Sequence, residues 1–182
     1  MFQLGDAWRD EVSLATQWRT SAPFPHLVID GFSAPDLMEV LEDQGVDRYQ
    51  GDLFEFEASP VGGLALAGEF ATLLCPVLER VTGKVVRKAD MRAYAYRPGH
   101  YLLPHTDHQD GLGRVLAYAW YLPTPEPPTG GELELFAGWE SARVIEPAPW
   151  RIAIFEVGDR SLHQVREVLS GLRLSLAGWF YA

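Results

Sequence analysis

The sequence predicts a mainly β fold with helices near the N-terminus, in which two sheets face each other as a jelly roll. Up to about residue 84, apolar residues recur mostly at the spacing of amphipathic helices. From Val85 onward the spacing changes to that of short strands, with Gly and Pro between them. A run of short strands separated by turn residues is typical of two-sheet β architectures.

Length and charge narrow the classes of function. The chain has 182 residues, a length typical of one domain, and 47% of them are hydrophobic, enough to form a core. We expect a single domain over residues 1–182, with a helical N-terminal support at about 1–84 and a jelly-roll core at about 85–182. The formal net charge of -10, without a run of Lys or Arg, argues against a surface that binds nucleic acid.

The N-terminus and the cysteine content predict a location. The first residues include acids where a secretory signal has basic residues before a long apolar run, and no stretch is long enough to span a bilayer. The single cysteine, Cys75, rules out an internal disulfide and falls in an apolar helical pattern, which predicts burial. We expect a cytoplasmic protein that does not associate with membranes.

Helices and one strand are expected ahead of the core. The first 20 residues are expected to be helical or irregular, and residues 24–32 have the apolar centre of a strand. A helix is predicted to follow, with Ser33 as its N-cap. A longer helix is predicted over residues 64–81, with Gly83 just beyond its end.

Eight short strands are expected after residue 85. In order they cover residues 89–96, 101–106, 114–122, 132–136, 143–146, 150–156, 163–168 and 173–180. Their number and length predict a double-stranded β-helix, the cupin-like form of the jelly roll. Trp179, on the last strand, is expected to pack in the core.

Two histidines and one aspartate predict a metal site. His105 and Asp107 are two positions apart on a predicted strand, so their side chains point to the same side. His163 begins a later strand and would complete a set of two imidazoles and one carboxylate, which holds non-haem Fe(II) with open positions for chemistry. The same donors also accept zinc or manganese, and each residue taken alone is more often a surface or hydrogen-bonding group.

Six ordered segments surround these residues. They are AYRPGHY at 95–101, RVLAYAWYL at 114–122, GGELELF at 130–136, PWRIAIF at 149–155, HQV at 163–165 and RLSLAGWF at 173–180. With the H-x-D triplet, their order and spacing resemble the prolyl-4-hydroxylase-like branch of the 2-oxoglutarate and Fe(II)-dependent oxygenases. The resemblance covers roughly residues 91–180, and a looser likeness extends to PFPHLVIDGF at 23–32. It implies Fe(II), 2-oxoglutarate and O2 as cofactor and cosubstrates, with ascorbate as an optional reductant.

Arg173 is expected to hold the distal carboxylate of 2-oxoglutarate. A guanidinium can form two parallel hydrogen bonds with a carboxylate, and Ser175 lies on the same face of the strand. The resemblance assigns this binding role to Arg173 with help from Ser175. It also places Tyr121 and Tyr96 beside the cosubstrate or substrate, and Arg114 near the substrate. Packing is an almost equally good reading for the tyrosines, and an exposed turn position is an equal reading for Arg114.

The resemblance implies a dioxygenase that hydroxylates a C–H bond with release of succinate and CO2. No catalytic residue beyond the three metal ligands is expected. Two substrate classes stay open: a prolyl or other residue in a peptide or protein, and a free amino acid or small metabolite. The alternative is a cupin-like protein that binds a metal or small ligand without turnover. The sequence does not predict an oligomeric state.

Three segments are expected to surround the opening to the metal: residues 51–63, 111–114 and 123–131. Loops on a rigid scaffold commonly form a substrate mouth, although an ordinary surface connection is an equal reading for the first segment. The acidic residues of that segment are Asp52, Glu55 and Glu57. An acidic rim would favour a neutral or cationic substrate.

Overall fold

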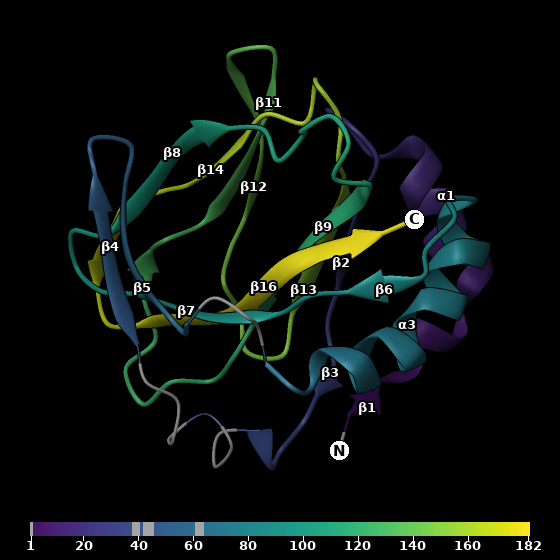
Figure 1. Cartoon of the computed structure of the whole chain (residues 1–182), viewed down its shortest axis with the longest axis horizontal. Helices are drawn as coiled ribbons and strands as arrows, with labels where there is room; N and C mark the ends of the chain where they lie inside the picture. The colour runs from purple at the N-terminus through teal and green to yellow at the C-terminus, as the bar shows by residue number, and fades with distance from the viewer. Residues whose placement is uncertain (1, 38–40, 42–45, 61–63) are drawn as a thin grey trace.

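The computed structural model describes residues 2–37, 41, 46–60 and 64–182. In these residues a strongly curved sheet is covered on one side by two α-helices, α1 and α3 (Figure 1). The helices are η1 (Asp6–Arg9), a 3-10 turn, α1 (Glu11–Thr20) and α3 (Ala67–Thr82). None of the helices in these ranges is long and apolar enough to cross a membrane.

Strands make up most of the fold. The N-terminal strands are β1 (Gln3–Leu4), β2 (His26–Ile29), β3 (Phe32–Ser33), β4 (Asp47–Gly51) and β5 (Phe54–Ala58). Those in the middle of the chain are β6 (Lys88–Ala89), β7 (Arg92–Tyr96), β8 (Tyr101–His105), β9 (Arg114–Tyr121) and β10 (Thr129–Gly130). The C-terminal strands are β11 (Leu133–Ala137), β12 (Glu140–Ile145), β13 (Ile152–Glu156), β14 (His163–Val165), β15 (Val168–Ser170) and β16 (Arg173–Tyr181).

The helical layer is held by one apolar face of each helix. In α3, Phe70, Leu74 and Leu78 recur at helical spacing and are fully buried. The helix ends at Gly83, whose φ of 71° is in the left-handed region that a side chain would strain. The long helix predicted from the sequence is therefore confirmed. The helix predicted after Ser33 falls mostly on residues 38–40 and 42–45, outside the described part of the chain, and Ser33 itself belongs to β3.

The expected jelly roll is confirmed by the order of the strands. The main sheet follows the path β12-β11-β14-β8-β5-β7-β16-β9-β13-β2. Its two halves fold over each other, because residues of β11 and β12 share one buried cluster with residues of β9 and β13. All eight expected strands are present, and the stretches at 89–96 and 163–168 are each divided into two strands. The result is a barrel-like pair of sheets with an interior between them.

Side chains of β9 point alternately into two buried clusters, one shared with the helices and one inside the barrel. Leu116, Tyr118 and Trp120 pack with the helices, whereas Ala117 and Ala119 belong to the cluster inside the barrel. Successive side chains of a strand point to opposite faces, so one strand serves both layers. The small alanine side chains leave space inside the barrel at the place where the candidate site lies.

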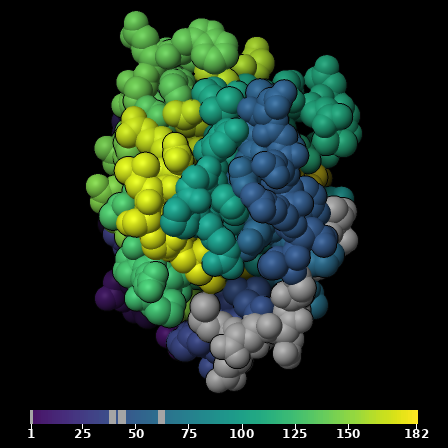
Figure 2. Space-filling model, turned by 90° about the vertical axis from the view of Figure 1, so that its left-hand side faces the viewer, coloured from purple at the N-terminus to yellow at the C-terminus, as the bar shows by residue number. Residues whose placement is uncertain are grey.

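The segment before residue 85 contributes strands as well as helices. β4 and β5 form an antiparallel hairpin, and β5 also pairs with β7 and β8 of the main sheet. The sequence pattern at residues 51–63 was expected to be an irregular loop, but it forms this hairpin as far as residue 58. Figure 2 shows the hairpin as a blue band that covers one side of the molecule next to the teal strands.

Candidate active site

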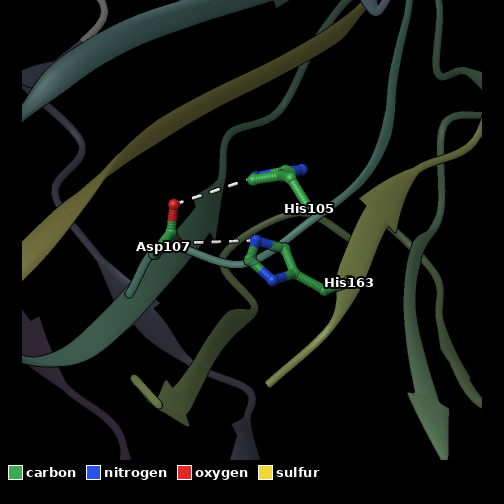
Figure 3. Close-up of side chains that lie close together, drawn as sticks. All are labelled: His105, Asp107 and His163. Atoms are coloured by element: carbon green, nitrogen blue, oxygen red, sulfur yellow. Dashed lines mark ion pairs between the residues drawn. The ribbon is translucent and has the colours of Figure 1, made fainter. Parts of the chain in front are cut away.

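His105, Asp107 and His163 converge inside the barrel. His105 ends β8 and is the cross-strand partner of His163, the first residue of β14, and Asp107 follows two positions after His105. The Asp107 carboxylate oxygens lie 3.8 Å from His105 Nε2 and 3.5 Å from His163 Nε2. Figure 3 shows the three side chains pointing toward one another, and one donor atom from each lies within 4.8 Å of the others.

Both imidazoles are oriented by backbone carbonyls. The Nδ1 of His105 lies 2.8 Å from the Leu103 carbonyl oxygen, and the Nδ1 of His163 lies 2.9 Å from that of Ser161. A proton on each Nδ1 leaves the Nε2 lone pair free, as metal-binding histidines require. Burial lowers the pKa of His163 to about 4, opposed by the Asp107 charge and assisted by His105. His163 is therefore neutral near pH 7, and the donor set fits a divalent metal ion.

Arg173 lies deep in the same interior, and no carboxylate pairs with it in the described part of the chain. Arg173 is the first residue of β16 and is only 3% exposed. Its Nη1 donates to Ser175 Oγ at 3.2 Å, while its Nε has no hydrogen-bond partner within the described residues. A buried guanidinium is costly to desolvate unless an anion pairs with it. The site therefore fits a ligand carboxylate at this position.

Two tyrosines flank the Arg173 guanidinium. Its central carbon lies 4.8 Å from the ring centre of Tyr96 and 5.1 Å from that of Tyr121. Burial raises the pKa of both phenols, so both carry a hydroxyl proton near neutral pH. The Tyr121 hydroxyl has no hydrogen-bond partner among the described residues. The four residues expected at the cosubstrate, Arg173, Ser175, Tyr96 and Tyr121, are thus brought together.

A cavity of about 260 Å³ connects the metal-binding residues to Arg173. Predicted site residues on its wall are His105, Asp107, His163, Arg173, Ser175 and Tyr96. Sequence reasoning missed several others, namely Phe54, Phe56, Tyr94 and Trp179. Trp179 packs against the buried cluster inside the barrel, as expected, and it also lines the cavity. The alternation of Phe and Glu in FEFE was the available signal, since it indicates a strand with one aromatic face.

The β4–β5 hairpin forms one side of this cavity, as expected for residues 51–63, although 61–63 are outside the described residues. The outer face of the hairpin is not a free acidic rim. Glu55 forms an ion pair with Arg48, and Glu57 forms one with Arg97. These pairs neutralise two of the three acids, so the acidic rim that was expected to favour a neutral or cationic substrate is largely compensated.

Arg114, at the end of the expected segment 111–114, and the loop at 123–131 lie in different places relative to the cavity. The Arg114 guanidinium lies 3.5 Å from the ring centre of Trp179 and donates to the Asp107 carbonyl at 3.3 Å. Arg114 thus lies behind a cavity residue and beside a metal-binding residue. Residues 123–131 do not line the cavity, because the end of this loop pairs with β15 and packs against the Arg173 segment. Its expected place around the opening stays a prediction.

A centre of two histidines and one carboxylate inside a jelly roll is the arrangement of non-haem Fe(II) enzymes. A family model described as the 2OG-Fe(II) oxygenase superfamily matches residues 91–181, and the chain belongs to this superfamily. Its members use Fe(II), 2-oxoglutarate and O2, and the His-Asp-His set and the buried Arg173 fit these groups. The family and cofactors expected from the sequence are confirmed.

Curated relatives are prolyl hydroxylases. The chain is 31% identical to prolyl 3-hydroxylase sudestada1 of Drosophila melanogaster, over 98% of this chain and 39% of that protein. It is 30% identical to prolyl 3-hydroxylase OGFOD1 of Mus musculus, over 87% of this chain and 33% of that protein. The chain therefore spans about two fifths or less of the length of these relatives.

Solved structures share the fold at low sequence identity. A Pseudomonas putida prolyl-4-hydroxylase matches with a TM-score of 0.71 and 18% identity, over 92% of this chain and 98% of that chain. A Trichoplax adhaerens prolyl hydroxylase, in complex with a hypoxia inducible factor peptide fragment, matches with a TM-score of 0.73 and 16% identity, over 96% and 90%. The prolyl-hydroxylase-like form of the jelly roll is thus confirmed.

Proposed function

We propose that this chain is an Fe(II)- and 2-oxoglutarate-dependent hydroxylase that acts on a prolyl residue of a peptide or protein. One observation carries the proposal: a cavity has two histidines and an aspartate on its wall together with a buried arginine that lacks a carboxylate partner among the described residues. A protein that only binds a metal has no need of a buried guanidinium beside it, since burying that charge is costly.

The proposed roles follow from the chemistry of each side chain. His105, Asp107 and His163 would hold Fe(II), and Arg173 with Ser175 would bind the distal carboxylate of 2-oxoglutarate. When bound, Fe(II), 2-oxoglutarate and O2 together supply the oxidation that hydroxylates a C–H bond, with release of succinate and CO2.

The chain itself binds, orients and excludes water. The tyrosine rings beside Arg173 shield its guanidinium from solvent, which strengthens its attraction for a carboxylate. The Tyr121 hydroxyl, which has no hydrogen-bond partner among the described residues, would donate to the same carboxylate. Phe54, Phe56 and Trp179 provide an apolar wall on which an uncharged ring can lie. Oxidation in a site closed by such walls is protected from water.

The identity of the substrate rests on the relatives. The two curated relatives described above are named prolyl 3-hydroxylases, so we propose carbon 3 of the prolyl ring as the site of hydroxylation. The apolar part of the cavity wall, formed by Phe54, Phe56 and Trp179, and the neutralised hairpin support a prolyl side chain over a charged free amino acid. The free buried thiol of Cys75 fits the reducing cytoplasm, where we propose that the protein acts.

A turnover assay tests the proposal. The protein is incubated with Fe(II), 2-oxoglutarate, ascorbate and a library of proline-containing peptides, and succinate is measured together with the peptide mass. We expect succinate formation coupled to the gain of one oxygen atom, and 3-hydroxyproline after acid hydrolysis of the product. The Asp107→Ala variant is the matched control without the carboxylate ligand. Succinate release that no proline-containing peptide stimulates would overturn the prolyl substrate.

A further inference from the structure

β14, which carries His163, is only three residues long and lies between β11 and β8. On the β8 side the register shifts between His163 and Val165, so pairing there is irregular at the proposed ligand. On the β11 side the register is regular, with Leu135 opposite His163 and Glu134 opposite Gln164. The position of His163 is therefore set mainly by β11.

Glu134 ties β11 to the segment that follows His163. Its carboxylate accepts from Arg166 Nε and Nη2, both at 2.7 Å, and from Gln164 Nε2 at 2.6 Å. Glu134 is 3% exposed, and these partners lower its pKa to about 2, Arg166 contributing most. A buried carboxylate with this many charge-assisted hydrogen bonds tolerates little displacement of its partners.

Register decides which way His163 points. Alternate side chains of a strand face opposite sides, so Leu135 packs inside the barrel and His163 lines the cavity, while Glu134 and Gln164 face outward. A slip of β14 by one residue along β11 would turn His163 away from Asp107. The same slip would separate Glu134 from Gln164 and Arg166, so these hydrogen bonds oppose it.

We propose that Glu134 is a positioning residue of the metal centre, which locks the register of β14 so that His163 faces Asp107. The inference rests on the proposed metal site at His105, Asp107 and His163. Glu134 does not touch the metal in this arrangement, and it acts through the backbone of β14. Its removal should therefore weaken metal binding even where the protein stays folded.

Co(II) is the probe, because its visible absorbance reports binding without turnover. We compare the Co(II) dissociation constants of the unchanged protein, Glu134→Gln and Glu11→Gln, after urea unfolding has shown that each is folded at the assay temperature. Glu11 is the matched control, since it holds Arg80 with two hydrogen bonds of 2.8 and 2.6 Å between α1 and α3. We expect at least about ten-fold weaker binding for Glu134→Gln, as for other residues that orient ligands, and an unchanged constant for Glu11→Gln.

The outcomes separate the two proposals. If the unchanged protein does not bind Co(II), the metal site itself is wrong. If the unchanged protein and a folded Glu134→Gln bind Co(II) equally well, the positioning role of Glu134 is wrong. If Glu134→Gln does not fold, Gln164→Ala replaces it, because it removes one link without leaving a buried charge. Gln164→Ala should weaken Co(II) binding in the same direction, and an unchanged constant there overturns the inference.

Discussion

His163 and His105 are partners across the neighbouring strands β14 and β8, and their ring centres lie 4.3 Å apart. The pairing brings together two residues that are far apart in the sequence, and Asp107 follows on the chain beyond β8. Strand pairing brings these side chains close. Because the pairing involves the backbone, the protein should keep its fold when one ligand is removed.

Removal of a metal ligand should abolish iron binding without unfolding the protein. His105→Ala, Asp107→Ala and His163→Ala each delete one of the three donors, and the strands that carry them remain paired. We expect loss of bound iron after dialysis, loss of succinate formation and an unchanged far-UV circular dichroism spectrum. A single variant with full iron content and full activity would remove that residue from the proposed set.

Arg173→Ala should mainly raise the KM for 2-oxoglutarate. A truncated charge-assisted contact costs about 2 kcal/mol or more, which corresponds to roughly a thirty-fold increase. Arg173→Lys should recover only part of the loss, because an ammonium group cannot reproduce the two parallel hydrogen bonds of a guanidinium. Steady-state kinetics at saturating peptide give the measurement. If both variants keep the original KM for 2-oxoglutarate, another residue binds the carboxylate.

Glu134 should make stability depend on pH in the acid range. Its pKa is lowered to about 2 in the folded protein from an ordinary 4.5, so it stabilises the fold above pH 4.5. This contribution should be lost as the pH falls from about 4.5 to about 2, and it amounts to at most about 3 kcal/mol.

Urea unfolding at a series of pH values measures this dependence. The difference in unfolding free energy between the unchanged protein and Glu134→Gln should shrink as the pH falls through that window. Glu140→Gln, at an exposed position on the edge strand β12, serves as the control. A difference that is constant from pH 6 to pH 2 would show that the charge of Glu134 contributes nothing.

Arg114→Ala should affect the peptide more than the cosubstrate. The guanidinium stacks on Trp179, which lines the cavity, and its loss frees the indole to move. A cation–π contact of this kind is worth about 1 kcal/mol, so we expect the KM for peptide to rise about five-fold. The KM for 2-oxoglutarate should not change, and Arg9→Ala, at an exposed position, is the control. An unchanged KM for peptide would leave Arg114 with a structural role alone.

Part of the proposed metal site could be predicted from the sequence, because local strand geometry places two of its three ligands near each other. His105 and Asp107 lie near each other wherever the chain is extended, and strand periodicity alone supplies that information. The later position of His163 and the R-x-S triplet at Arg173 were interpreted by resemblance to a family. The structure brings all of them to one cavity.

The aromatic wall could not be predicted in the same way. The alternation of Phe and Glu at 54–57 indicates a strand with one aromatic face, but it does not show that β5 pairs with both β7 and β8, which is what turns Phe54 and Phe56 toward the cavity. Likewise, Glu55 and Glu57 are acidic in the sequence, but their charges are compensated by Arg48 and Arg97 across the fold. Trp179 has the pattern of a core residue because the cavity is itself part of the barrel interior.

An anaerobic titration tests the central claim most directly. Fe(II) is added to the protein with and without 2-oxoglutarate, and the visible charge-transfer absorbance of the Fe(II)–2-oxoglutarate chelate is recorded. We predict a band that requires both components and saturates at one Fe(II) per chain, and that is lost in Asp107→Ala. For Arg173→Ala the band should appear only at much higher 2-oxoglutarate concentration. Absence of the band in the unchanged protein at saturating Fe(II) and 2-oxoglutarate would contradict the account.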